Sequence, residues 1–399
     1  MKRLATLVIT FLFCAFLNAQ AVLSSQAMSS LLTCSPGEPV YLKFGHTAIR
    51  VCDAKQDIDL VFNYGVFSFD EDNFIMHFVA GETDYQLAVQ SYNRFVNSYI
   101  AEGRKVFEQP LNLDSVQLQE LFSKLLINSQ PENKVYRYNF IFDNCATRPY
   151  AMLDSVLNGQ LKAYPPHYAD TTTTFRQAIR HYTHTNSWGQ LGIDLCFGTD
   201  ADQPMRNHER LFLPEQLMNY VATVDMGGQR LTSSIDTLTF KIEPVNWWTS
   251  PAAAMLLALV ITLVFSLSYA WRKGTVPYLI DSILYLLAAL IGTLLIYLWF
   301  FSVHAFVQNN WNIVILNPLM WLPFICTLFR RGRHWLNLRQ RTLLAYDLTA
   351  VAAYMLSPQD NMLVFTLIMA LVTLHTTRIL IASGVIAPPN RTKSDKKNK

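Results

Sequence analysis

One cysteine stands in a setting that suits a nucleophile. Cys145 follows the polar pair Asp143 and Asn144 and precedes residues 146–157, which are predicted to form a helix. The partial positive charge at a helix N-terminus favours a thiolate, and Arg148 adds a full positive charge one turn later. The free N–H groups there, above all that of Cys145 itself, can hold an oxyanion. Cys145 is therefore the candidate nucleophile, and the alternative is a small buried apolar residue.

A thiol nucleophile needs a base, and His46 is the first candidate. It lies in a predicted strand, from which its ring can reach a cysteine on a helix end packed against the sheet. Papain-type enzymes use this geometry with a third polar group that orients the imidazole. Asn63, on the next predicted strand, is the first candidate for that role, and Asp59 is the second. Two other histidines compete as bases: His77 and His304. The alternative is that His46 is a core histidine whose hydrogen bonds are satisfied and which has no catalytic role.

Strand-like segments surround these residues. Residues 41–51 and 59–69 are rich in aromatic and β-branched side chains, and the polar segment 53–57 separates them. This pattern predicts two strands joined by a turn. Residues 135–142 are another strand-like run and lead directly into Asp143.

Helical segments follow the same logic. Residues 113–127 carry apolar side chains on one face, and Asp114 with Gln117 three positions later predicts a capping box at the start. Residues 175–182 form another amphipathic stretch. Pro214 is predicted to be the first residue of a further helix, where its missing N–H costs nothing.

The composition separates a polar region from an apolar one. The chain has 399 residues, of which 51% are hydrophobic and 15% charged, and its mean hydropathy is +0.18. Soluble domains carry roughly 25% charged residues. The charge deficit lies in the last 150 or so residues, so the pattern excludes a purely soluble enzyme and a disordered chain. The net charge of +3, with no basic patch, gives no support for binding nucleic acid.

The chain divides into four predicted parts. Residues 1–19 have a positive start and an apolar core, which predicts a signal peptide; a retained first membrane helix is the alternative. Residues 20–250 are the exported domain, 251–382 the membrane domain and 383–399 a basic cytoplasmic tail. Five apolar segments are predicted to cross the membrane: 251–271, 282–303, 311–329, 342–356 and 362–380.

The loops between these segments predict the orientation. Lys and Arg gather after the first segment, between the third and fourth, and in the tail, whereas loops 302–310 and 357–361 contain none. The positive-inside rule assigns the basic loops to the cytoplasm and therefore the exported domain to the other side. Asp281 and Asp347 are predicted to lie near the cytoplasmic side or to face the bundle interior.

The remaining cysteines and histidines predict neither a metal site nor a cofactor. They lack close ligand spacing, and no glycine loop that would cradle a phosphate is present. Cys34 and Cys52 lie in an oxidising compartment if the domain is exported, so the sequence leaves open whether they form a disulfide.

Three motifs resemble a known family. They are Phe-Gly-His-Thr-Ala-Ile-Arg-Val at 44–51, Phe-Asn-Tyr-Gly at 62–65, and Tyr-Asn-Phe-Ile-Phe-Asp-Asn-Cys-Ala-Thr-Arg at 138–148. Together they resemble the Lnb-type periplasmic domain of Bacteroidetes inner-membrane proteins, which is similar to the permuted NlpC-like papain superfamily that includes lecithin:retinol acyltransferase. The resemblance implies an α+β fold: a permuted papain-like domain followed by an all-α bundle of about five transmembrane helices. His46 and Cys145 carry over from the motif, whereas related enzymes place a second histidine where Asn63 stands.

The same resemblance implies a lipoprotein N-acyltransferase of the bacterial inner membrane. Cys145 would take an acyl chain from a phospholipid as a thioester, and the free amine of a diacylglyceryl-cysteine lipoprotein would then accept it. Two alternatives remain: a membrane-anchored papain-like peptidase or amidase that acts on cell-wall peptide, and a non-catalytic membrane scaffold. Five spans exceed what an anchor requires, which favours the acyltransferase.

Five residues are candidates for substrate binding: Tyr64, Asn144, Arg148, His304 and Asn310. The first three belong to the motifs around the predicted dyad. The last two belong to a polar and aromatic cluster, 304–317, at the predicted outer end of the second and third spans. Such a cluster can bind a lipid headgroup, and the alternative is that it anchors the chain at the interface and caps helices.

Overall fold

The computed structural model describes residues 22–68, 70, 72–163, 166, 170–233, 246–359 and 365–386. The predicted signal peptide and most of the predicted tail lie outside these residues. The chain forms two compact units that alternate along the sequence. The sheet unit comprises Met1–Asp72, Thr83–Ala169 and Arg206–Phe240, and the helical unit comprises Asn73–Glu82, Asp170–Met205 and Lys241–Lys399. The predicted domain boundary at residue 250 stays a prediction.

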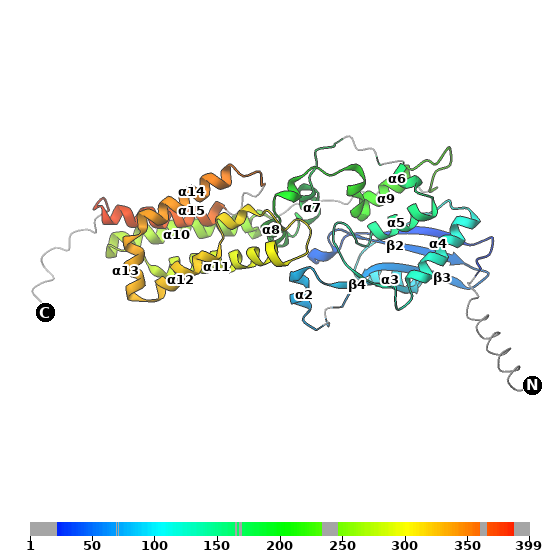
Figure 1. Ribbon diagram of the computed structural model, residues 1–399, viewed down its shortest axis with the longest axis horizontal. Coiled ribbons are helices and arrows are strands. Elements are labelled where there is room, and N and C mark those ends of the chain that lie inside the picture. Colours follow the sequence, from blue (N-terminus) through cyan, green and yellow to red (C-terminus); the bar gives the residue numbers. More distant parts are fainter. Residues whose placement is uncertain are drawn as a thin grey trace, which may run out of the picture. The chain divides into compact units, whose positions relative to one another are not determined.

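A six-stranded antiparallel sheet is the framework of the sheet unit (Figure 1), in the order β5-β1-β2-β3-β4-β6. Its strands are β1 (Met28–Cys34), β2 (His46–Asp53), β3 (Ile58–Val66), β4 (Asp84–Ser91), β5 (Val106–Pro110) and β6 (Val135–Arg137). The strands predicted at 41–51 and 59–69 correspond to β2 and β3. The run at 135–142 forms only the short β6, because Asn139 Oδ1 accepts hydrogen bonds from the N–H groups of Ile141 and Phe142 and turns the chain.

Successive residues on a strand face opposite sides of a sheet, so the sheet has two apolar faces. One face carries Leu31, Ile49 and Phe62 and packs against helices α4 (Ser115–Asn128), α5 (Thr147–Val156) and α9 (Pro214–Thr223). The opposite face carries Leu32, Ala48 and Val61 and packs against α3 (Tyr92–Ala101). Short helices complete this unit: η1 (Val40–Leu42), α6 (Gln160–Ala163) and η3 (Asn207–Phe212). We call the second face the α3 face.

The predicted helix starts are confirmed in this unit. Asp114 caps α4 and Gln117 reaches back to the Asp114 N–H, which completes the predicted capping box. Pro214 is the first residue of α9, as its position predicts. Local signals for helix ends therefore carry over into the fold.

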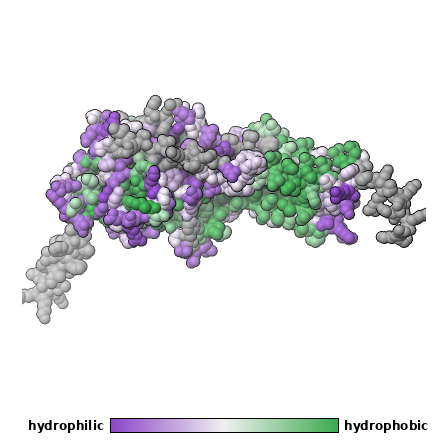
Figure 2. All heavy atoms as spheres, turned by 180° about the vertical axis from the view of Figure 1, so that it is seen from behind, coloured by the Kyte–Doolittle hydropathy of each residue, from purple (hydrophilic) through white to green (hydrophobic). Residues whose placement is uncertain are grey.

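The helical unit contains long apolar helices. Its elements are α2 (Phe74–Ala80), α7 (Phe175–Thr183), α8 (Ser187–Cys196), η2 (Thr199–Asp202), η4 (Trp247–Thr249), α10 (Pro251–Lys273), α11 (Tyr278–Phe301), η5 (Trp311–Val314), η6 (Pro318–Met320), α12 (Trp321–Leu328), α13 (Arg330–Leu338), α14 (Gln340–Met355) and α15 (Phe365–Ala382). Among the described residues, three segments are long and apolar enough to cross a membrane: Pro251–Lys273, Tyr278–Phe301 and Trp311–Leu328. Figure 2 shows hydrophobic side chains gathered over the surface of this region. The count of five spans stays a prediction.

Polar side chains lie inside this apolar bundle. His375 Nδ1 is 2.6 Å from Asp347 Oδ2, and His375 Nε2 is 2.6 Å from the Tyr285 hydroxyl. Asp281 forms an ion pair with Arg378. All of these side chains are buried, so the two aspartates face the bundle interior. Buried charges are retained where a partner neutralises them, and here each charged group has one.

Candidate active site

Cys145 lies in the turn before α5, two residues ahead of its first residue. Asn144 fixes this turn: its Oδ1 accepts from the N–H groups of Ala146 at 2.8 Å and Thr147 at 2.9 Å. Its Nδ2 donates to the carbonyl oxygens of Phe140 and Phe212. Asn144 therefore satisfies free N–H groups at the start of the helix and ties the turn to two other segments.

A bulge in β3 opens space beside the cysteine. The pairing of β3 with β4 shifts between Asn63 and Val66, and Gly65 lies at φ +85°, which favours glycine. A Cβ atom built on Gly65 would lie 3.4 Å from Cys145 Cβ, 3.9 Å from His46 Cε1 and 3.9 Å from Tyr138 Cε2. Cys145 Cβ and His46 Cε1 therefore both lie within van der Waals contact of one point above Gly65, and the absence of a side chain there leaves space between them.

Asn63 fixes the orientation and tautomer of His46. Both side chains belong to the α3 face, and His46 Nε2 lies 2.5 Å from Asn63 Oδ1. An amide oxygen can only accept, so Nε2 carries the proton and Nδ1 keeps a lone pair. A neutral imidazole with a free Nδ1 is the form that a general base requires.

Burial keeps both groups of the dyad neutral. Loss of hydration lowers the pKa of His46 to about 4, although the hydrogen bond to Asn63 works in the opposite direction. Burial likewise raises the pKa of Cys145 to about 11. The backbone N–H groups of Thr47 and of Cys145 itself favour the thiolate and lower the pKa, but their effect is smaller. The N–H groups at the start of the helix therefore act in the predicted direction, but desolvation outweighs them and the net pKa of the thiol is raised.

The backbone around the sulfur can serve a developing negative charge. The backbone N–H groups of Thr47 and of Cys145 itself lower the pKa of the Cys145 thiol, so both groups favour negative charge on the sulfur. The pairing of β2 with β3 begins at Ile49 and Phe62, so Thr47 lies before the first paired residues of these two strands. An oxyanion hole needs such N–H groups to donate to the carbonyl oxygen of a bound acyl group, and these two are the candidates beside the nucleophile.

Three residues that the sequence analysis did not identify border the dyad on the α3 face. The Tyr99 ring stacks on His46 with a centroid distance of 6.3 Å, and the Arg104 guanidinium lies 4.5 Å from the Tyr99 ring centre. Cys34 pairs with His46 across β1 and β2. Arg104 is 6% exposed, and within the described part of the chain its Nη2 has no hydrogen-bond partner. Its positive charge lowers the pKa of Cys145 and of His46.

Aromatic rings lead away from the site on another side. Tyr138 stacks on Tyr85 with centroids 4.0 Å apart, Tyr85 stacks on Phe67 at 4.7 Å, and Phe67 meets Tyr41 edge-on at 6.0 Å. Tyr41 is 52% exposed. We call these four rings the aromatic row; it connects the point above Gly65 with the surface of the sheet unit.

The three predicted substrate-binding residues of the sheet unit all have protein partners. Tyr64 follows Asn63 on β3, so it faces the opposite side of the sheet, where its hydroxyl donates to Asn128 Oδ1 at 2.7 Å. Arg148 forms a bidentate pair with Asp143 and stacks on Tyr136 at 3.4 Å. Asn144 caps α5, as described above. A role for them in substrate binding stays a prediction.

His304 and Asn310 belong to the helical unit. His304 Nε2 is 2.5 Å from the carbonyl oxygen of Phe78 in α2, and Asn310 Nδ2 donates to the carbonyl oxygens of Leu195 and Cys196. Both side chains therefore connect loop 302–310 to segments that precede the apolar helices. Their predicted role in headgroup binding remains untested.

The competing residues lie elsewhere. Asp59 is held by Arg50 at 2.7 Å, and His77 is exposed on α2 in the helical unit. Cys34 and Cys52 are free thiols. They lie at opposite ends of the β1–β2 ladder, six positions apart, which separates them by about 20 Å, too far for a disulfide. No group of three His, Cys, Asp or Glu that could hold a metal occurs in the described residues.

Comparison with known families finds matches over two long stretches of the chain. The model of the Lnb N-terminal periplasmic domain matches residues 15–182, and that of the Lnb transmembrane domain matches residues 243–384. No curated protein and no solved structure matches the chain. The two matches confirm the resemblance seen in the motifs, and they indicate a membrane protein with a periplasmic domain. The chain belongs to the Lnb family.

Proposed function

We propose that this protein is a thiol acyltransferase that moves a fatty acyl chain from a phospholipid to the N-terminal amine of a diacylglyceryl-cysteine lipoprotein. The observation that carries the proposal is the approach of Cys145 and His46 to one point above Gly65, with His46 held by Asn63. Membership of the Lnb family supports it, because that family implies a lipoprotein-modifying enzyme.

In the first half-reaction the sulfur of Cys145 attacks the carbonyl carbon of a phospholipid acyl ester. His46 Nδ1 takes the thiol proton as the S–C bond forms, so no free thiolate is required beforehand, in agreement with the neutral pair favoured by burial. The Thr47 and Cys145 N–H groups hold the oxyanion. The ester C–O bond then breaks, and the departing alkoxide of the lysophospholipid receives the proton from His46.

In the second half-reaction the free amine of the lipoprotein attacks the thioester. His46 removes a proton from the attacking nitrogen and returns it to the sulfur as the C–S bond breaks. The product is an amide, and Cys145 is again a thiol. A neutral, poorly hydrated site favours the amine over water as the acceptor, because it disfavours hydroxide.

The aromatic row is compatible with an apolar substrate. Its rings lie between the point above Gly65, which Tyr138 contacts, and exposed Tyr41, so apolar side chains border the proposed site. Burial of methylene groups against such side chains contributes about 0.8 kcal/mol each. A long hydrocarbon chain therefore gains binding energy beside the reacting carbonyl.

The test expresses the chain in a bacterium whose own lipoprotein N-acyltransferase has been depleted. Mass spectrometry of a reporter lipoprotein then measures the added N-acyl chain, and hydroxylamine release from Cys145 measures the thioester. Loss of N-acylation is expected in Cys145→Ser and His46→Ala. The matched control is Cys52→Ser, the same change at a free thiol on the far end of β2.

N-acylated reporter in cells that hold only Cys145→Ser would refute the proposal. Release of cell-wall peptide fragments that depends on Cys145, with no change in the reporter, would assign the dyad to a peptidase or amidase instead. Full cellular function of both Cys145→Ser and His46→Ala, without any acyl transfer or peptide release that depends on these residues, would leave a non-catalytic scaffold.

A further inference from the structure

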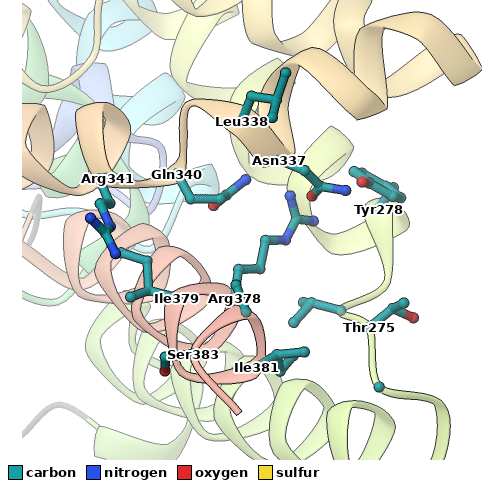
Figure 3. Close-up of a pocket in the computed structure, with 13 residues that line it drawn as sticks. Thr275, Tyr278, Asn337, Leu338, Gln340, Arg341, Arg378, Ile379, Ile381 and Ser383 are labelled. Carbon is teal, nitrogen blue, oxygen red and sulfur yellow. The ribbon is translucent and has the colours of Figure 1, made fainter. Parts of the chain in front are cut away.

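A cavity of about 370 Å³ lies within the helical unit, where the α10–α11 connection, the α13–α14 junction and the end of α15 meet. Sites for small molecules usually measure roughly 300–1,000 Å³. Figure 3 shows the Arg378 side chain extending from α15 toward Asn337 and Tyr278, with Gln340 nearby. The cavity is therefore large enough for a polar headgroup and has a guanidinium aimed into it.

Arg378 carries a hydrogen-bond donor that the described protein does not use. Its side chain is 6% exposed, one nitrogen pairs with Asp281, and the guanidinium lies 4.5 Å from the centre of the Tyr278 ring. Nη1 is buried and has no hydrogen-bond partner in the described part of the chain. A buried donor without a partner costs roughly 1–3 kcal/mol, so a ligand that accepts from Nη1 removes a penalty.

The other polar groups of the cavity define the ligand's chemistry. Gln340 Oε1 is also buried and has no partner among the described residues, whereas its Nε2 donates to the Leu336 carbonyl oxygen. Arg341 adds a second positive charge, and no acidic side chain is among the described residues that line the cavity, although Asp281, which does not line it, pairs with Arg378. The site therefore offers the unused Nη1 of Arg378 and the cation of Arg341 to an anion, and one amide oxygen to a donor.

We propose that this cavity binds a phosphoester headgroup, with phosphate oxygens on Arg378 and Arg341 and an ammonium or hydroxyl group on Gln340 Oε1. Arginine is the side chain best suited to phosphate, because it donates two parallel hydrogen bonds. A membrane phospholipid and a soluble phosphoester offer the same chemistry, and the experiment separates these two sources.

The site is independent of the proposed acyl transfer. All its residues belong to the helical unit, at an end bordered by basic residues that the positive-inside rule assigns to the cytoplasm: Arg272, Lys273, Arg330, Arg331 and Arg333. The predicted substrate lipid lies in the other leaflet. A headgroup here is therefore a ligand that stabilises the bundle, rather than an acyl donor.

The experiment measures thermal unfolding of the full-length protein in an uncharged detergent. The additives are phosphatidylethanolamine, phosphatidic acid, diacylglycerol, inorganic phosphate and O-phosphoethanolamine. Arg378→Lys keeps a charge for Asp281 but removes Nη1, and Arg341→Gln removes the second cation. Arg339→Gln is the matched control, because Arg339 is exposed two positions away and does not line the cavity.

Both phospholipids are expected to raise the unfolding temperature, and diacylglycerol is not. Arg378→Lys and Arg341→Gln should each weaken this binding about tenfold, the loss expected for a charge-assisted hydrogen bond, while Arg339→Gln leaves it unchanged. Gln340→Leu should weaken binding of phosphatidylethanolamine more than that of phosphatidic acid, which has no ammonium group.

The soluble additives identify the source. Stabilisation by inorganic phosphate or O-phosphoethanolamine alone, with the same dependence on Arg378 and Arg341, supports the site with a soluble ligand. Stabilisation by lipids alone supports a headgroup. An equal loss of binding affinity in Arg341→Gln and Arg339→Gln would overturn the proposal. So would the absence of any rise in unfolding temperature with every phosphate-containing additive.

Discussion

His46 Nε2 lies 2.5 Å from Asn63 Oδ1, and this contact leaves Nδ1 of the imidazole without a proton. Asn63→Ala removes the acceptor and lets the ring rotate or change tautomer. Loss of such a buried hydrogen bond costs roughly 1–3 kcal/mol, so the rate of N-acylation is expected to fall about ten- to a hundredfold. Reporter lipoprotein assays in membranes measure this rate, and an unchanged rate would exclude Asn63 as the orienting residue.

Gly65 leaves open the space beside Cys145 and His46. In Gly65→Ala the new methyl group fills this space at ordinary contact distances, 3.4 Å from Cys145 Cβ and 3.9 Å from His46 Cε1, so it competes with a substrate acyl group and activity should fall. The positive φ also costs about 1–2 kcal/mol of stability. Gly159→Ala is the control: its φ is +79°, and a Cβ there meets nothing within 4 Å. Similar thermal destabilisation of both variants, with activity reduced only in Gly65→Ala, is the expected result; equal activities contradict it.

Alkylation of Cys145 reports the ionisation of the dyad. Because burial raises the pKa of the thiol to about 11, the rate of reaction with iodoacetamide should rise with pH from neutrality toward that value. A preformed thiolate–imidazolium pair would instead give a rate that is already constant across neutral pH. The measurement follows modification of Cys145 by mass spectrometry, with Cys52 as the internal reference.

The depressed pKa of His46 makes the stability of the sheet unit depend on pH. The folded protein holds His46 neutral down to about pH 4, whereas the unfolded chain takes up a proton near 6.5. Between these values the unfolded state binds more protons, so the free energy of unfolding falls as the pH falls from 6.5 to 4. His46→Gln should show a shallower decline in thermal unfolding over this window, and an equally steep one would refute the assignment.

Asn144 is expected to act through structure. Asn144→Ala removes a helix cap, worth about 1 kcal/mol, and the donor to the Phe140 and Phe212 carbonyl oxygens, worth about 1–3 kcal/mol more. Asn144→Asp retains the capping oxygen but turns a second, charged oxygen toward the Phe140 and Phe212 carbonyl oxygens in a buried position, so its stability should be no higher than that of the alanine variant. Chemical unfolding orders the three, and an unchanged stability of the alanine variant would favour a role in substrate binding.

Local patterns predicted much of the site, because strands and helix ends are encoded over short distances. β2 and β3 could be predicted from their β-branched and aromatic residues, and this placed His46 near Asn63. The period of two along β3 also separates Asn63 from Tyr64, which places their side chains on opposite faces of the sheet. The strand pattern therefore predicts that only one of the two can face His46.

The other features of the site depend on packing between segments that are distant in the sequence. Tyr99 and Arg104 reach His46 only because α3 packs on that face of the sheet, and no local signal announces this contact. The thiol pKa depends on how much water surrounds Cys145, which local sequence does not encode. The Gly65 bulge had a visible signal, a glycine inside a strand-like run, which is typical of a bulge or a close approach.

The way α2 is built into the chain bears on biogenesis. This helix belongs to the loop between β3 and β4, yet it packs within the helical unit, where Ala80 accepts a hydrogen bond from the Val303 N–H and His304 contacts the Phe78 carbonyl oxygen. The ribosome makes α2 more than two hundred residues before those partners. α2 can therefore reach its native contacts only after the last third of the chain has been made, and no single proteolytic cut would yield two intact halves.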